Sequence, residues 1–135
     1  MKSSNVTQKL LEYPTKTVKR AEIALSCSPF YLKLFKQMRN QSVPISAIAA
    51  QQGVEKGYAK KVFSEADAED RLVWLIKVGL LRREVDGQGL TDSFRLTPLG
   101  RQIVAKWEKQ GDRIPKPSLI ARISNWLNRW LQWSL

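Results

Sequence analysis

One stretch of the chain, from Asp67 to Val104, constrains the fold more than any other. It opens with an acidic start and an apolar block, after which Gly79 stands where a helix ends in the left-handed conformation. The residues that follow predict two short strands, over 80–85 and 93–96, joined by a polar turn. Thr97-Pro98 then supplies an N-cap and a first helical residue. The stretch therefore predicts a helix, a β-hairpin and the start of another helix.

The sequences that flank this hairpin resemble those of winged helix-turn-helix proteins. GLL at 79–81 precedes it, and FRLTPLG at 94–100 closes it. Both look like the sequences around the wing in small bacterial repressors of the multiple-antibiotic-resistance type. They are equally similar to the N-terminal dimerisation domains of small-molecule O-methyltransferases, which share the fold and bind no DNA. The resemblance covers roughly Phe30 to Lys109 and implies a fold more than a function.

Two helices are expected upstream of this stretch. The segment 15–26 places apolar residues at helical spacing, with basic residues on the exposed side. Ser28 and Pro29 then have the residue types of an N-cap and a first helical position. The strongly apolar helix that they begin is predicted to end near Asn40 and to be the first helix of the winged core.

A helix-turn-helix is predicted between this helix and the hairpin. A helix that opens at Pro44 is expected to end at Gly53, which would mark the turn. The residues that follow are too many for one uncapped helix before the hairpin. They are interpreted as a helix or turn over 55–63 and a helix over about 67–78, with Ser64 as the residue that caps it.

The fold class that follows is mainly α with a small β-hairpin. It is a winged helix-turn-helix core, closed by a helix over 98–109 and followed by a C-terminal amphipathic helix. The expected divisions are a basic N-terminal segment with a short helix over 1–27, the winged-helix core over 28–110, a linker over 111–117 and the amphipathic helix over 118–135.

The composition argues against an enzyme. Histidine is absent, and the single cysteine, Cys27, can complete neither a disulfide nor a cysteine-based metal cluster. The glycine patterns that bind phosphates or dinucleotides are also absent. The sequence therefore predicts no catalytic residues, no metal and no cofactor.

Two features bear on localisation. Residues 1–11 lack the apolar core of a signal peptide, and no run approaches the roughly 20 apolar residues of a membrane-spanning helix. We therefore expect the protein in the cytoplasm, with peripheral attachment to the inner face of a membrane as an alternative.

The formal charge of +11 suggests an anionic partner. DNA binding by a transcription regulator is the favoured function, because this fold so often binds DNA. Near neutrality over 42–112, where eleven basic residues face ten acidic ones, and the acidic start of the helix at 67–78 argue against it. The basic residues placed to contact double-stranded DNA are Lys16, Lys19, Arg20, Lys56, Lys60, Lys61, Arg82, Arg83 and Arg95.

The tail over 118–135 predicts an amphipathic helix whose apolar residues fill an arc of roughly 140°. Tryptophans beside an acid-free face with arginine are typical of a helix that lies in a membrane interface. Packing on the body, pairing with a second copy in a homodimer, and a groove on another protein are the alternatives. The alternative function is thus an adaptor attached to a membrane or protein partner. The residues expected to make this contact are Ile123, Trp126, Leu127, Trp130, Leu131, Arg122 and Arg129.

Overall fold

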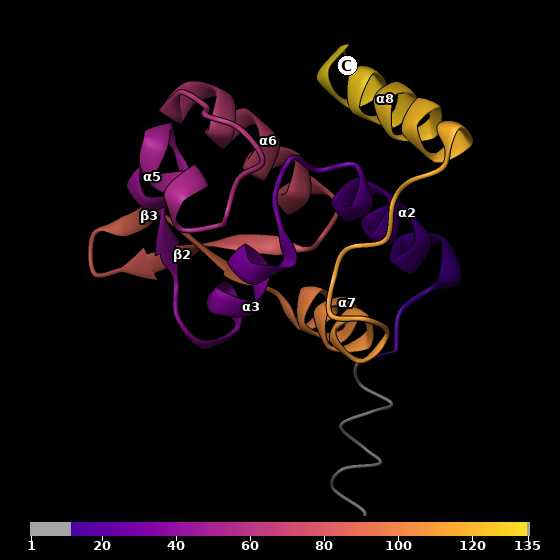
Figure 1. Ribbon diagram of the computed structural model, residues 1–135, viewed down its shortest axis with the longest axis horizontal. Coiled ribbons are helices and arrows are strands. Elements are labelled where there is room, and N and C mark those ends of the chain that lie inside the picture. The colour runs from indigo at the N-terminus through magenta and orange to yellow at the C-terminus, as the bar shows by residue number, and fades with distance from the viewer. Residues whose placement is uncertain (1–11, 135) are drawn as a thin grey trace, which may run out of the picture.

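Residues 12–134 are described by the computed structural model, in which helices surround a small sheet (Figure 1). The mainly helical fold with a hairpin and a C-terminal helix confirms the predicted fold class. In chain order the elements are α2 (Thr15–Ser26), α3 (Leu32–Asn40), β1 (Val43–Pro44), α4 (Ile45–Ile48), α5 (Ala50–Glu55), α6 (Glu65–Lys77), β2 (Leu81–Asp86), β3 (Gly89–Leu96), α7 (Pro98–Lys109) and α8 (Leu119–Ser134).

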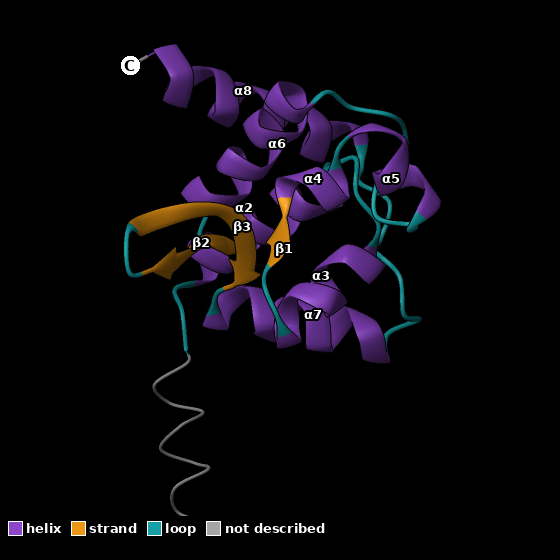
Figure 2. Cartoon of the chain, turned by 90° about the vertical axis from the view of Figure 1, so that its left-hand side faces the viewer, coloured by secondary structure: helices purple, strands orange, loops and turns teal. Residues whose placement is uncertain are grey.

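The sheet is antiparallel, with β3 between β1 and β2 (Figure 2). Leu81 pairs with Leu96 at the base of the hairpin, and Asp86 pairs with Gly89 at its tip. The returning strand therefore begins at Gly89, earlier than the predicted 93–96, because the turn is tighter than the polar sequence suggests. Val43 of β1 pairs with Phe94 on the other edge of β3.

The core lies between the sheet and helices α2, α3, α6 and α7. Phe30, Phe35 and Phe94 are fully buried in it, and the rings of Phe30 and Phe35 meet edge to face at 6.3 Å. Helix α2 contributes Ala21 and Leu25, both buried, so the basic N-terminal helix is part of the same core.

The predicted helix boundaries around the hairpin are confirmed. Ser64 caps α6 by accepting a hydrogen bond from the backbone N–H of Asp67 at 3.1 Å. Gly79 follows α6 with φ of 89°, the left-handed conformation expected of it. Thr97 caps α7 by accepting from the N–H of Gly100 at 3.1 Å, and α7 spans the predicted residues.

Ser28 does not cap a helix, which corrects one expectation. Helix α3 begins at Leu32, and the backbone just before it is extended instead. Tyr31 N–H donates to the Tyr58 carbonyl at 2.9 Å, and Lys60 N–H donates to the Pro29 carbonyl at 2.9 Å. Pairing with this distant segment holds residues 29–31 out of the helix.

Gly53 does not end a helix either. The predicted helix is broken into α4 and α5 at Ala50, which has φ of 58° and donates its N–H to the Phe63 carbonyl. Gly53 lies inside α5, where a Cβ would stand 1.8 Å from the Ile48 carbonyl oxygen. The left-handed residue after α5 is Gly57, with φ of 75°. Gly53 therefore permits a close approach of backbone to backbone.

This contact predicts the effect of Gly53→Ala. Although alanine ordinarily favours a helix over glycine, the added methyl group must push the α4 backbone away, so we expect a loss of about 2–4 kcal/mol in unfolding free energy. Urea denaturation of the full-length protein measures it. Gly87→Ala is the control, because nothing lies within 4 Å of a Cβ there. Equal stability of the two variants would contradict this account.

Candidate functional site

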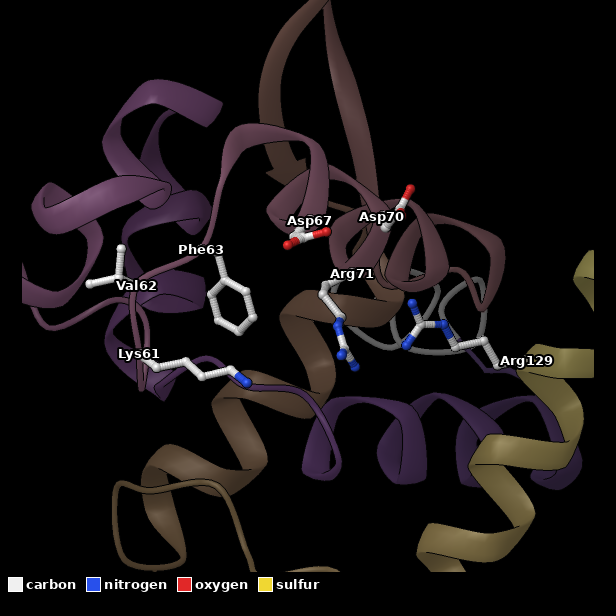
Figure 3. Close-up of a pocket in the computed structure, with 7 residues that line it drawn as sticks. All are labelled: Lys61, Val62, Phe63, Asp67, Asp70, Arg71 and Arg129. Carbon is white, nitrogen blue, oxygen red and sulfur yellow. The ribbon is translucent and has the colours of Figure 1, made fainter.

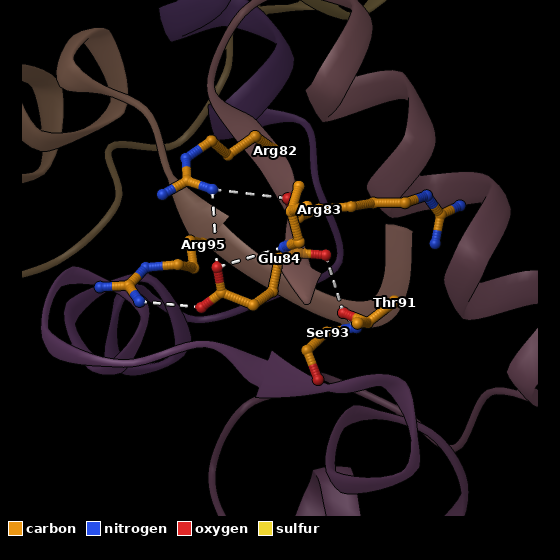
Figure 4. A network of polar contacts seen from close by, with 7 residues as sticks. Arg82, Arg83, Glu84, Thr91, Ser93 and Arg95 are labelled. Atoms are coloured by element: carbon orange, nitrogen blue, oxygen red, sulfur yellow. Dashed lines mark hydrogen bonds and ion pairs between the residues drawn. The ribbon is translucent and has the colours of Figure 1, made fainter. Parts of the chain in front are cut away.

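The three wing arginines are held in ion pairs within the domain, and Figure 4 shows those of Arg82 and Arg95 with Glu84. Arg95 Nη1 lies 2.9 Å from Glu84 Oε2, and Arg82 Nη1 lies 3.7 Å from the other carboxylate oxygen. The hydrogen bond from Arg95 is the main reason that the pKa of Glu84 is lowered. Arg83 reaches Glu69 of α6 at 3.3 Å. The positive charge of these arginines is therefore largely compensated by carboxylates of the same chain.

Helix α6 lies between α5 and the hairpin, the position that the resemblance to winged-helix proteins assigns to the helix that reads the DNA groove. Its first turns expose Glu65, Asp67 and Asp70, and Glu69 is half-buried beside Arg83. These carboxylates repel a DNA backbone that approaches the exposed side of α6.

The remaining predicted DNA contacts form two groups. Lys16, Lys19 and Arg20 are exposed on α2, which lies at the opposite end of the molecule from the hairpin tip (Figure 1). The exposed Lys56, Lys60 and Lys61 lie in the connection between α5 and α6. The nine predicted cations therefore do not form one continuous surface.

Helix α8 lies on the body through its polar side. Trp74 of α6 donates its indole N–H to Asn125 Oδ1 at 3.0 Å. Cys27, after α2, places its Sγ 4.0 Å from the Ala121 carbonyl oxygen, and burial raises the pKa of its thiol. Ala121, Asn125 and Arg129 are half-buried. The body therefore contacts α8 through polar groups, whereas a helix that packs into a core would need an apolar groove.

The apolar stripe of α8 faces away from the body. We call it the outer face; its side chains are between 44% and 80% exposed. Trp126 and Trp130 stack on it, with ring centroids 6.4 Å apart and planes at 15°. The outer face consists of Leu119, Ile120, Ile123, Trp126, Leu127, Trp130 and Leu131.

The two arginines of the tail that were predicted to contact a partner differ in their exposure. Arg122 is exposed, whereas Arg129 is half-buried against α6. Sequence reasoning missed the residues that receive α8, namely Cys27, Arg71 and Trp74. Trp74 stands within an apolar block of α6, and no local pattern shows that its N–H faces the tail.

The chain belongs to the Npun_F0494-like family, whose model matches residues 11–129. Comparison with curated proteins and with solved structures gave no significant match. None of the helices within residues 12–134 combines the length and apolarity needed to cross a membrane. Family membership states no activity or partner, so function rests on the geometry.

The contact between Trp74 and Asn125 predicts how firmly α8 is held. Asn125→Ala leaves the indole N–H of the buried Trp74 without its acceptor, so the docked state of α8 should lose about 1 kcal/mol. Hydrogen exchange of the α8 backbone amides measures this opening. Asn128→Ala, on an exposed position of the same helix, is the matched control. Equal exchange in both variants would show that the hydrogen bond does not hold the helix.

Proposed function

We propose that this protein is a non-enzymatic adaptor that attaches to an anionic membrane surface through the outer face of α8. The observation that carries the proposal is the orientation of this helix, which has its polar side on the body and its apolar side in solvent. A contiguous exposed apolar stripe on a folded protein marks a site of interaction. Stacked tryptophans suit the membrane interface, because the rings are apolar and the indole N–H groups can bond to headgroups.

The charge around α8 supports an anionic surface as the partner. Four basic residues and no acidic residue occur over 113–135. Arg122 is exposed on α8 itself, and Arg113 and Lys116 are exposed on the connection that leads to it. Each basic residue near an anionic leaflet contributes about 1 kcal/mol of attraction. A protein groove lined with apolar residues would gain nothing from this absence of acids.

The remainder of the chain fits the role of a scaffold. The order α3, β1, α4, α5, α6, β2, β3 resembles that of a winged helix. In this protein the wing arginines are paired with Glu84 and Glu69, and α6 exposes carboxylates. These features favour contact with another protein over contact with a phosphate backbone.

Vesicle binding tests the proposal. Full-length protein should co-sediment with phosphatidylcholine vesicles that contain an anionic lipid. The double variant Trp126→Ser, Trp130→Ser should bind at least about tenfold more weakly, because two exposed rings no longer leave water on binding. Binding should also weaken as the salt concentration rises.

The matched control is Val85→Ser, Leu90→Ser, which removes two exposed apolar side chains from the hairpin. It should bind vesicles as the parent does. If the protein binds no vesicles but forms a dimer that the tryptophan substitutions dissociate, then the partner of the outer face is a second copy of the chain and not a membrane. If both double variants lost vesicle binding equally, α8 would not be the element that attaches the protein to the membrane.

DNA binding is the second candidate, and one observation favours it. Lys56, Lys60 and Lys61 have no ion pair among the described residues and directly precede α6 in the chain. Lys60 and Lys61 lie over the rings of Tyr31 and Phe63, at 5.7 and 5.2 Å, which holds their charges at this edge of the domain.

The DNA candidate predicts duplex binding with a steep salt dependence. Lys60→Ala with Lys61→Ala should weaken it and reduce the slope of log affinity against log salt by about two units. Fluorescence anisotropy with a labelled duplex of mixed sequence measures both quantities. Lys106→Ala with Lys109→Ala on α7 is the control. No binding at low salt would eliminate this candidate.

A further inference from the structure

A pocket of about 310 Å³ lies where α8 meets the first turns of α6 and the loop before it (Figure 3). Lys61 comes from the loop, Arg71 from α6 and Arg129 from α8. Figure 3 shows the three cationic groups directed toward the same space, with the Asp70 carboxylate turned away from it. The pocket is lined by Lys61, Val62, Phe63, Asp67, Asp70, Arg71 and Arg129.

The three cations of this pocket outnumber the two carboxylates that line it, Asp67 and Asp70, and form an ion pair with neither. Among the described residues, no carboxylate lies within 4.0 Å of Lys61, Arg71 or Arg129. Asp67 and Arg71 are four residues apart on α6, the spacing at which helical ion pairs form, and yet they make none. The guanidinium of Arg71 points instead into the pocket, between Lys61 and Arg129.

Arg129 shows the consequence of this arrangement. Burial lowers its pKa first, the like charge of Arg71 lowers it further, and Asp70 opposes both. Arg71 is exposed and Arg129 is half-buried, and the like charges of their guanidinium groups repel. A bound anion would remove this repulsion and would hold α8 to α6 at the same time.

We propose that this pocket binds a phosphate group between Lys61, Arg71 and Arg129. Arginine presents a planar fork of N–H donors that fits two phosphate oxygens, and lysine adds a compact charge. Two forks from facing helices can contact different oxygens of one phosphate. The oxygens of a phosphate point in different directions, whereas the two oxygens of a carboxylate lie in one plane and suit donors from three sides less well.

The phosphate group belongs either to a lipid headgroup or to a free phosphate. Identification with a headgroup rests on the proposed function, whereas the pocket itself does not. A helix that lies in a membrane interface keeps its polar side at the level of the headgroups. Arg129 occupies that side of α8, between the two stacked tryptophans in sequence. The pocket would therefore meet headgroups when the outer face enters the membrane.

Inorganic phosphate is the first probe, titrated into the full-length protein at constant ionic strength with chloride as the balancing ion. The side-chain Nε–Hε NMR signals of Arg71 and Arg129 should shift and saturate together. Arg71→Gln should weaken the affinity by roughly tenfold or more, since a charged hydrogen-bond donor is lost. Arg101→Gln, on an exposed position of α7, should leave it unchanged.

Thermal unfolding separates this effect from a loss of folding. In chloride, Arg71→Gln should unfold at the parent's temperature or above it, because the substitution removes a repulsion. In phosphate the parent should gain stability and the variant should not. Phosphate shifts that do not saturate, or that Arg101→Gln reduces as much as Arg71→Gln does, would overturn the site.

Vesicles identify the source of the phosphate. Phosphatidylcholine vesicles that carry either phosphatidic acid or oleate are compared at equal surface charge. With a headgroup site, Arg71→Gln weakens binding to the phosphatidic acid vesicles by about tenfold and leaves binding to the oleate vesicles unchanged. Equal loss on both would overturn the headgroup assignment. Saturable binding of phosphate by the Trp126→Ser, Trp130→Ser variant, whose binding to vesicles is weakened, would support the pocket on its own.

Discussion

The hydroxyl of Thr97 lies where α6 ends, the hairpin closes and α7 begins. Its Oγ1 is within hydrogen-bond distance of the Gly79 and Leu80 carbonyls and accepts from the Gly100 N–H, while the Thr97 N–H donates to the Leu80 carbonyl. One side chain thus fixes the relation of two helices to the sheet. The position of α6 in turn sets where Trp74 and Arg71 meet the C-terminal helix.

How much of the fold the sequence could predict depends on where each contact originates. The caps at Ser64 and Thr97 were predictable because donor and acceptor lie within three residues of each other. The boundaries at Ser28 and Gly53 were not. The first boundary is set by extended pairing with residues 58–60, and the second by the nearby Ile48 carbonyl. Helix propensity predicts neither contact. Errors therefore fall where tertiary contacts override a local signal.

The candidate site divides in the same way. Helical periodicity predicted which residues share the outer face, but it could not predict that this face points away from the body. That orientation follows from the indole of Trp74, far from Asn125 in the chain. Likewise, the wing arginines were recognisable as cations, whereas their partners depend on strand register and on Glu69 of α6. No pattern in the sequence indicates that Arg71 and Arg129 lie close together.

The outward orientation of α8 also affects how quickly attachment can occur. Many amphipathic anchors are folded against their own protein and must first be released, so only the open fraction of molecules can bind. Here the anchor is presented in the unbound state, with its helix formed and its tryptophans stacked. Under the proposed function, attachment needs no opening step. Its rate would then be set by encounter with the surface, and its control would have to come from the surface's own charge.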